Sequence, residues 1–138
     1  MTTQENTKVT ISAKIEAPIE KVWDLWTSPQ HITQWNQASE DWHSPRAEND
    51  LRVGGKFLSR MEAKDGSFGF DFEGIYDKVE LQKEITYTMS DGRKVTTLFT
   101  EQGGKTRVET TFDAETENDP EFQKQGWQAI LNNFVKYV

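Results

Sequence analysis

The sequence predicts an α+β domain in which an antiparallel sheet packs against one long C-terminal helix. Two observations carry the prediction. Turn-forming residue pairs separate a series of short strand-like segments, and strands joined by hairpins are antiparallel. Residues 119–138 carry apolar side chains at helical spacing and form one broad apolar stripe. Such a stripe has to be buried, and the sheet is the surface available to cover it.

The N-terminal part predicts one strand followed by two short helices. Residues 1–7 are polar and are expected to be frayed. Residues 9–16 alternate between apolar and polar side chains, which is typical of a half-buried strand. Ala17-Pro18 begins a helix because proline suits the first helical turn. Ser28-Pro29 ends that helix and begins a second one over residues 30–35.

The middle of the chain predicts hairpin-linked strands. Residues 36–50 are polar, contain Pro45 and are expected to be irregular. Gly54-Gly55 is interpreted as a bulge or a tight turn, and three further turns are expected at Asp65-Gly66, Asp91-Gly92 and Gly103-Gly104. The expected strands between and around them are 56–63, 68–73 continuing into 75–81 with a bulge near Gly74, 85–89, 93–100 and 106–112.

The last element is a long helix with a clear start. Asp119 is a suitable N-cap, Pro120 suits the first helical position, and Glu121 places a negative charge in the first turn. A glycine inside a helix costs about 1 kcal/mol relative to alanine. Close approach of the helix to the sheet or room for a ligand would offset this cost at Gly126. Close packing is the preferred interpretation, and any cavity is then expected toward one end of the helix.

Composition excludes several classes of function. A chain of 138 residues is expected to form one domain, residues 1–138. The formal net charge of −7 argues against nucleic acid and anionic membranes as partners. The absence of cysteine excludes disulfides and thiolate chemistry. No signal peptide and no membrane-spanning stretch is visible, which predicts a cytoplasmic protein.

An ordered set of residues is shared with a known family. The set comprises Ala17-Pro18, Val22-Trp23, Trp26-Thr27, Pro29, Trp35, residues 50–57, residues 65–67 through 74–76, Gly126-Trp127 and Leu131. In these residues the chain resembles, over residues 7–138, the family named for the activator of the ninety-kilodalton heat-shock-protein ATPase. That family lies within the START-like (SRPBCC) superfamily. The resemblance implies a helix-grip fold, in which a curved antiparallel sheet grips the long helix.

The resemblance leaves the activity open. The family's members are divided among chaperone activators, binders of hydrophobic ligands and many small bacterial proteins. The chaperone activators resemble this chain in one of their two domains, and this chain has no room for the other.

The candidate ligand-binding residues come from two inward faces. Phe68, Phe70 and Phe72 lie at alternate positions of one strand and are expected to form one wall of a cavity. The full set of candidates is Phe57, Met61, Phe68, Phe70, Phe72, Tyr87, Trp127, Ile130, Leu131 and Phe134. Ser59, Tyr76 and Tyr87 are candidates for orienting the polar part of a ligand. The same residues are also compatible with a solid core.

Catalytic and metal-binding patterns are weak. Asp71 and Glu73 lie opposite the phenylalanine row, so they are expected to face solvent and to pair with Arg60. The spacing of His31 and His43 matches no common zinc site. Gly54-Gly55 lacks the helix and the Lys-Ser or Lys-Thr pair of a phosphate loop. No catalytic residue, metal or cofactor is predicted.

The leading hypothesis is non-catalytic binding of a small hydrophobic molecule between the helix and the sheet. A second hypothesis is a protein-interaction module that stimulates a chaperone ATPase, as the family name implies. A third is a hydrolase or cyclase that uses the same cavity, since one fold hosts many activities.

Overall fold

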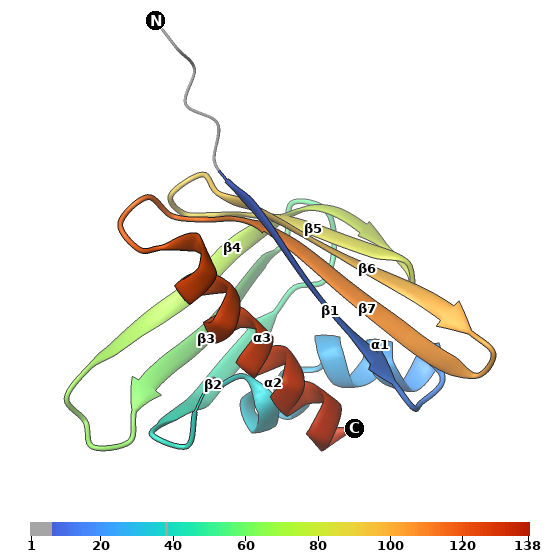
Figure 1. The fold of residues 1–138 in the computed structure, drawn as a ribbon, viewed down its shortest axis with the longest axis horizontal. Coiled ribbons are helices and arrows are strands. Elements are labelled where there is room, and N and C mark those ends of the chain that lie inside the picture. Colours follow the sequence, from blue (N-terminus) through green and yellow to red (C-terminus); the bar gives the residue numbers. More distant parts are fainter. Residues whose placement is uncertain (1–6, 38) are drawn as a thin grey trace, which may run out of the picture.

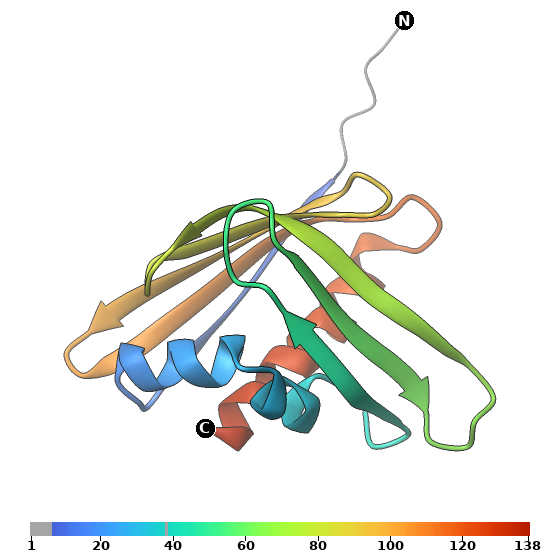
Figure 2. The same cartoon turned by 180° about the vertical axis from the view of Figure 1, so that it is seen from behind.

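The computed structural model describes residues 7–37 and 39–138, which form a seven-stranded sheet and three helices (Figures 1 and 2). The elements in chain order are β1 (Lys8–Ile15), α1 (Ile19–Thr27), α2 (Pro29–Trp35), β2 (Trp42–Asn49), β3 (Lys56–Ala63), β4 (Gly69–Glu80), β5 (Glu84–Met89), β6 (Lys94–Gln102), β7 (Lys105–Asp113) and α3 (Pro120–Tyr137). The predicted α+β arrangement is confirmed.

The sheet is antiparallel throughout, with the strand order β1-β7-β6-β5-β4-β3-β2. Every neighbouring pair except β1 and β7 is consecutive in the chain, as hairpin connections require. β1 pairs with β7 and closes that edge. The sheet curves, and α3 lies across its concave side beside β1, with α1 and α2 below (Figure 1). This is the expected helix-grip arrangement.

The two short helices follow the proline signals. α1 begins after Pro18, whose carbonyl accepts hydrogen bonds from the N–H groups of Lys21 and Val22. Pro29 occupies the first turn of α2, and the carbonyl of Ser28 accepts from the N–H groups at the start of that helix. The missing N–H of proline costs nothing there, because the first N–H groups of a helix have no partner inside it.

Two predictions about the strands are wrong. Residues 42–49 form the edge strand β2, although residues 36–50 were expected to be irregular. Its polar side chains and its register shift between His43 and Arg46, around Pro45, suit an edge strand but hide the period of two. The irregularity in β4 lies between Tyr76 and Lys78 rather than near Gly74. Both strands are nonetheless hydrogen-bonded along most of their length.

The expected fraying falls mainly on residues 1–6, which lie outside the described residues. Thr7, at the end of that stretch, is tied to the fold because its carbonyl accepts a hydrogen bond from the N–H of Ala114 at 2.8 Å. This bond extends the pairing of β1 with β7 by one residue.

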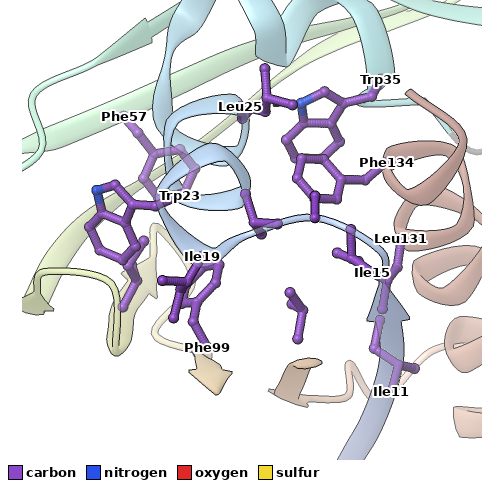
Figure 3. Packing of buried hydrophobic residues seen from close by; sticks show 14 of the residues in the cluster. Ile11, Ile15, Ile19, Trp23, Leu25, Trp35, Phe57, Phe99, Leu131 and Phe134 are labelled. Atoms are coloured by element: carbon purple, nitrogen blue, oxygen red, sulfur yellow. Dashed lines mark hydrogen bonds between the residues drawn. The ribbon is translucent and has the colours of Figure 1, made fainter. Parts of the chain in front are cut away.

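The start of α3 forms as predicted. Asp119 is the N-cap, and its side chain accepts a hydrogen bond from the N–H of Glu121 at 2.8 Å. In the C-terminal half, Phe134 is fully buried, and its ring centre lies 4.9 Å from that of Trp26 and 4.8 Å from that of Trp35. Figure 3 shows Phe134 pointing from α3 toward Trp35. This aromatic cluster anchors α3 to α1 and α2.

The interpretation of Gly126 is wrong. A Cβ atom placed on Gly126 would meet no atom within 4 Å, apart from its chain neighbours and the backbone of its own helix. The helix therefore does not approach the sheet closely at this point. The glycine is not required by packing, and it gives no reason for a cavity to lie at one end of the helix.

Candidate functional site

A cavity of about 300 Å³ lies between α3, the concave face of the sheet and the α1–α2 segment. It is lined by Ile11, Trp26, Thr27, Ile32, Trp35, Asn36, Phe57, Ser59, Met61, Phe70, Phe72, Tyr76, Ile85, Tyr87, Val95, Thr97, Thr110, Trp127, Ile130 and Leu131. Its size lies at the lower end of the range of sites that hold small molecules. The lining is mostly aromatic and aliphatic, which suits an apolar ligand.

The sheet wall depends on a close approach between β3 and β4. Gly74 lies opposite Phe57 in the register, and a Cβ atom at Gly74 would lie 2.8 Å from Cε2 of Phe57 and 2.8 Å from the carbonyl oxygen of Thr88. Only glycine leaves room for the Phe57 ring in this position. That ring lies edge-on to Tyr87, with 4.6 Å between the ring centres. Gly74 thus shapes the cavity wall.

The helix wall comes from the middle of α3, which contributes Trp127, Ile130 and Leu131. Trp127 lies flat on Phe112 of β7, with ring centres 4.1 Å apart and planes 9° from parallel. This stack holds the helix at β7. Between it and the Phe134 cluster, the helix spans the cavity.

Eight of the ten residues proposed from the sequence line the cavity. Phe68 does not, because it precedes β4, is 61% exposed and packs against Trp42 and Phe70. Phe134 does not, because the rings of Trp26 and Trp35 cover it. Phe70 is 42% exposed and also lines the cavity, so the cavity opens to solvent beside it.

Sequence reasoning missed the lining residues on the α1–α2 segment and on β6 and β7. Trp26 lies in the first predicted helix, but the sequence does not show that its side chain reaches the cavity. On β6 and β7, the buried side chains alternate as Val95, Thr97 and Phe99 and as Thr106, Val108, Thr110 and Phe112. The alternation of these inward positions is present in the sequence as a period of two. It is hard to recognise because several of the inward residues are threonines, which are polar. The hydroxyls of Thr97 and Thr110 bond each other at 2.9 Å, and this bond satisfies both polar groups inside the protein.

Two groups of polar side chains bear most directly on ligand binding, and the lining also contains Thr27, Asn36, Thr97 and Thr110. In the first, the hydroxyl of Tyr76 donates to Oδ1 of Asn49 at 2.5 Å, and Nδ2 of Asn49 donates to the carbonyl of Thr27 at 2.6 Å. In the second, the hydroxyls of Ser59 and Tyr87 form no hydrogen bond with any described residue, although Ser59 is only 5% exposed. These two groups are available to a ligand.

Burial changes the acidity of both tyrosines. Removal from water raises the pKa of the Tyr87 hydroxyl far above its ordinary value, with a smaller contribution from Tyr76. Burial also raises the pKa of Tyr76, and the hydrogen bond to Asn49 opposes that rise. The cavity therefore disfavours a negative charge.

Of the candidates for acid–base chemistry, Tyr76 lines the cavity, whereas Arg60, Asp71, Glu73, His31 and His43 do not. The predicted pairing of Arg60 with Asp71 is confirmed at 3.3 Å, and Glu73 pairs with Lys56 at 3.3 Å. His31 contacts the hydroxyl of Tyr137 at 2.6 Å. Within residues 7–37 and 39–138, no three His, Asp or Glu side chains are grouped to hold a metal ion.

None of the three described helices has the length and the apolar character needed to cross a membrane.

Comparison with known proteins places this fold in a family. A sequence model of the family described as Activator of Hsp90 ATPase homolog 1-like protein matches residues 16–138. The solution structure of the AHSA1-like protein from Aeromonas hydrophila is 48% identical, covers 96% of this chain and 92% of its own, and superposes with a TM-score of 0.90. The solution structure of a protein from Cytophaga hutchinsonii is 51% identical over 94% of this chain and 90% of its own, with a TM-score of 0.84.

A more distant structure shares the fold alone. A crystal structure of a protein from Chromobacterium violaceum is 20% identical, covers 96% of this chain and 97% of its own, and has a TM-score of 0.85. A search of curated proteins finds no match. Together these similarities support a START-like module of the ligand-binding or activator-like kind.

Proposed function

Since this chain belongs to the Activator of Hsp90 ATPase homolog 1-like family, we propose that its cavity binds a small, mostly apolar molecule without converting it chemically. The observation that carries the proposal is the lining of the cavity. Aromatic and aliphatic side chains from the sheet, α3 and the α1–α2 segment surround about 300 Å³ of space that opens beside Phe70. A solid core made of the same side chains would leave no such space.

The affinity would come from removing apolar surface from water, at about 25 cal/mol per Å². Aromatic rings add directional contacts with a flat ligand. The lining offers no carboxylate, imidazole, ammonium or guanidinium among the described residues, and tyrosine is its one kind of ionisable side chain. This composition favours binding over general acid–base catalysis, which uses groups that titrate near the working pH.

The test uses a neutral fluorescent probe, N-phenyl-naphthylamine, whose emission rises in an apolar site. We expect saturable binding that shifts the amide signals of residues on β3, β4 and the middle of α3. Ile130→Phe fills the cavity from the helix side and is expected to abolish binding. Gln125→Phe adds the same ring at an exposed position of α3 and is expected to leave binding intact. If probe binding is equal in both variants, the cavity is not the binding site.

A second candidate is stimulation of an Hsp90-type chaperone, as the family description implies. The observation that favours it is an aromatic cluster in which the exposed Phe68 and Phe70 pack against the half-buried Trp42, an apolar surface suited to docking on another protein. The test is ATP hydrolysis by the chaperone from the same organism, with and without this protein. Stimulation that is lost in Phe68→Ser supports the candidate, and the absence of both stimulation and complex formation removes it.

A further inference from the structure

The polar groups of the cavity define what kind of apolar molecule it accepts. Of the 20 described residues that line the cavity, none is Lys, Arg, His, Asp or Glu. A carboxylate or an ammonium group that enters the cavity loses its water without meeting an opposite charge on these lining residues. Such a loss is costly in an apolar site, so a charged ligand is at a disadvantage from the start.

On β3 and β4, the charged side chains next to lining residues are held on the other face of the sheet. On β3, Arg60 alternates with the lining residues Ser59 and Met61, and it is engaged by Glu62 at 2.8 Å and by Asp71 at 3.3 Å. On β4, Glu73 alternates with the lining residue Phe72 and pairs with Lys56 at 3.3 Å. These two side chains are paired outside the cavity. Arg93, which directly precedes β6 and lowers the pKa of Tyr87 slightly against the effect of burial, is not a lining residue and is held by Asp91 at 2.7 Å.

The hydroxyls of Thr27, Thr97, Thr110 and Tyr76 are already used within the protein. The side-chain amide of Asn36 is a further polar group of the lining. The hydroxyls of Ser59 and Tyr87 keep their hydrogen-bonding capacity, and each can both donate and accept. Such groups suit a hydroxyl or a carbonyl on the ligand. The raised pKa of Tyr87 and Tyr76 points the same way, because an environment that resists a phenolate also resists a carboxylate.

We propose that the cavity selects uncharged molecules, whose polar part is a hydroxyl or carbonyl group received by Ser59 or Tyr87, and that it rejects carboxylate and ammonium analogues of the same size. This inference rests on the proposed binding function and adds the chemical class of the ligand.

The test is a series of three probes that share one ring system: naphthylmethanol, naphthoate and naphthylmethylammonium. Each displaces N-phenyl-naphthylamine in competition at neutral pH. We expect naphthylmethanol to bind more tightly than either charged member by about tenfold or more. Equal or tighter binding of either charged member overturns the charge selectivity while leaving the binding function intact. If no member of the series and no neutral probe binds, both proposals fail.

A gain-of-function variant provides an independent readout. Met61→Arg places a cation on the wall beside Phe70, close to the opening, and is expected to improve naphthoate binding over naphthylmethanol. Glu101→Arg adds a positive charge at an exposed position of β6 and is expected to leave the order of the series unchanged. An unchanged order in a folded Met61→Arg protein contradicts the proposal. The wild-type series remains decisive if Met61→Arg does not fold.

A second pair of probes tests whether the hydroxyls of Ser59 and Tyr87 receive the polar group of the ligand. Naphthylmethanol and ethylnaphthalene have nearly the same shape, and we expect the wild-type protein to prefer the alcohol. In the double variant with Ser59→Ala and Tyr87→Phe, this preference is expected to disappear. If the double variant keeps the preference, the polar group of the ligand is received elsewhere.

Discussion

The indole ring of Trp127 lies flat on the ring of Phe112, with 4.1 Å between the ring centres. This contact joins the middle of α3 to β7, on one side of the cavity. On the other side, the ring of Phe134 packs edge-on against Trp26 and Trp35, which stack on each other. The helix is therefore held at two aromatic contacts separated by two turns, and the cavity lies beside the segment between them. Such a support keeps the space open without a ligand.

Replacing Trp127 with alanine removes the first of these contacts. We expect Trp127→Ala to lower the free energy of unfolding by about 2 kcal/mol, since Trp127 is partly buried and its loss removes the stack on Phe112. Phe122→Ala removes a ring from the same helix that is 67% exposed and should change stability by less than about 0.5 kcal/mol. Urea unfolding measures both. Similar effects of the two substitutions would show that the stack does not hold the helix.

Two glycines predict opposite effects of the same substitution. Gly126→Ala is expected to raise stability by about 1 kcal/mol, because alanine is the better helix former and its Cβ meets open space. Gly74→Ala is expected to lower stability by about 1–3 kcal/mol, because its Cβ collides with Phe57 and with the Thr88 carbonyl. Thermal and urea unfolding of the pair decide the matter. Destabilisation by Gly126→Ala would indicate a close contact at the helix after all.

From the raised pKa of Tyr87 we predict that the free energy of unfolding falls at alkaline pH. Its raised pKa means that the folded protein keeps the hydroxyl protonated after the unfolded chain has lost its proton. The stabilisation is therefore complete below about pH 10 and declines above it, at a rate that approaches about 1.4 kcal/mol per pH unit for this one group. Tyr87→Phe removes that contribution, so its stability should fall less steeply between neutral and strongly alkaline pH. Parallel curves for the two proteins would contradict the burial of this hydroxyl.

From the position of Phe70 we predict that a ligand leaves the cavity beside this ring. Its ring lines the cavity and is also 42% exposed. Phe70→Ala should widen the opening and increase the dissociation rate of N-phenyl-naphthylamine several-fold in stopped-flow experiments. Phe68→Ala removes a neighbouring ring that does not line the cavity, and it should change this rate little. An opening elsewhere is indicated if the two variants release the probe equally fast.

The local patterns of the chain were sufficient for most elements. The alternation in β1, the prolines that begin α1 and α2, and the N-cap Asp119 each act within a few residues, so they are visible in the sequence. β2 escaped prediction because it is a polar edge strand interrupted at Pro45, and pairing with β3 decides its conformation. The role of Gly74 escaped for a similar reason, since it depends on a phenylalanine 17 positions earlier in the chain.

The residues of the candidate site were also predictable where they depend on local spacing and not where they depend on distant contacts. Period-two and helical spacing placed Phe57, Met61, Phe72 and Ile130 on inward faces. Spacing did not separate Phe134 from Ile130, although one is covered by two indole rings and the other faces the cavity. It also did not show that α1 and α2 supply Trp26 and Trp35, because that depends on how the segment crosses the open side of the sheet.

The sequence by itself determined which residues are apolar, which faces of the elements they occupy and where the chain turns, because these properties depend on neighbours in the chain. Only the tertiary structure decided that the inward face of α3 contacts the inward face of the sheet at some points and leaves a space at others. Two aromatic contacts hold α3, while the curvature of the sheet carries β3 and β4 away from it. The space that remains between them results from contacts between residues far apart in the chain, and this space is the proposed binding site.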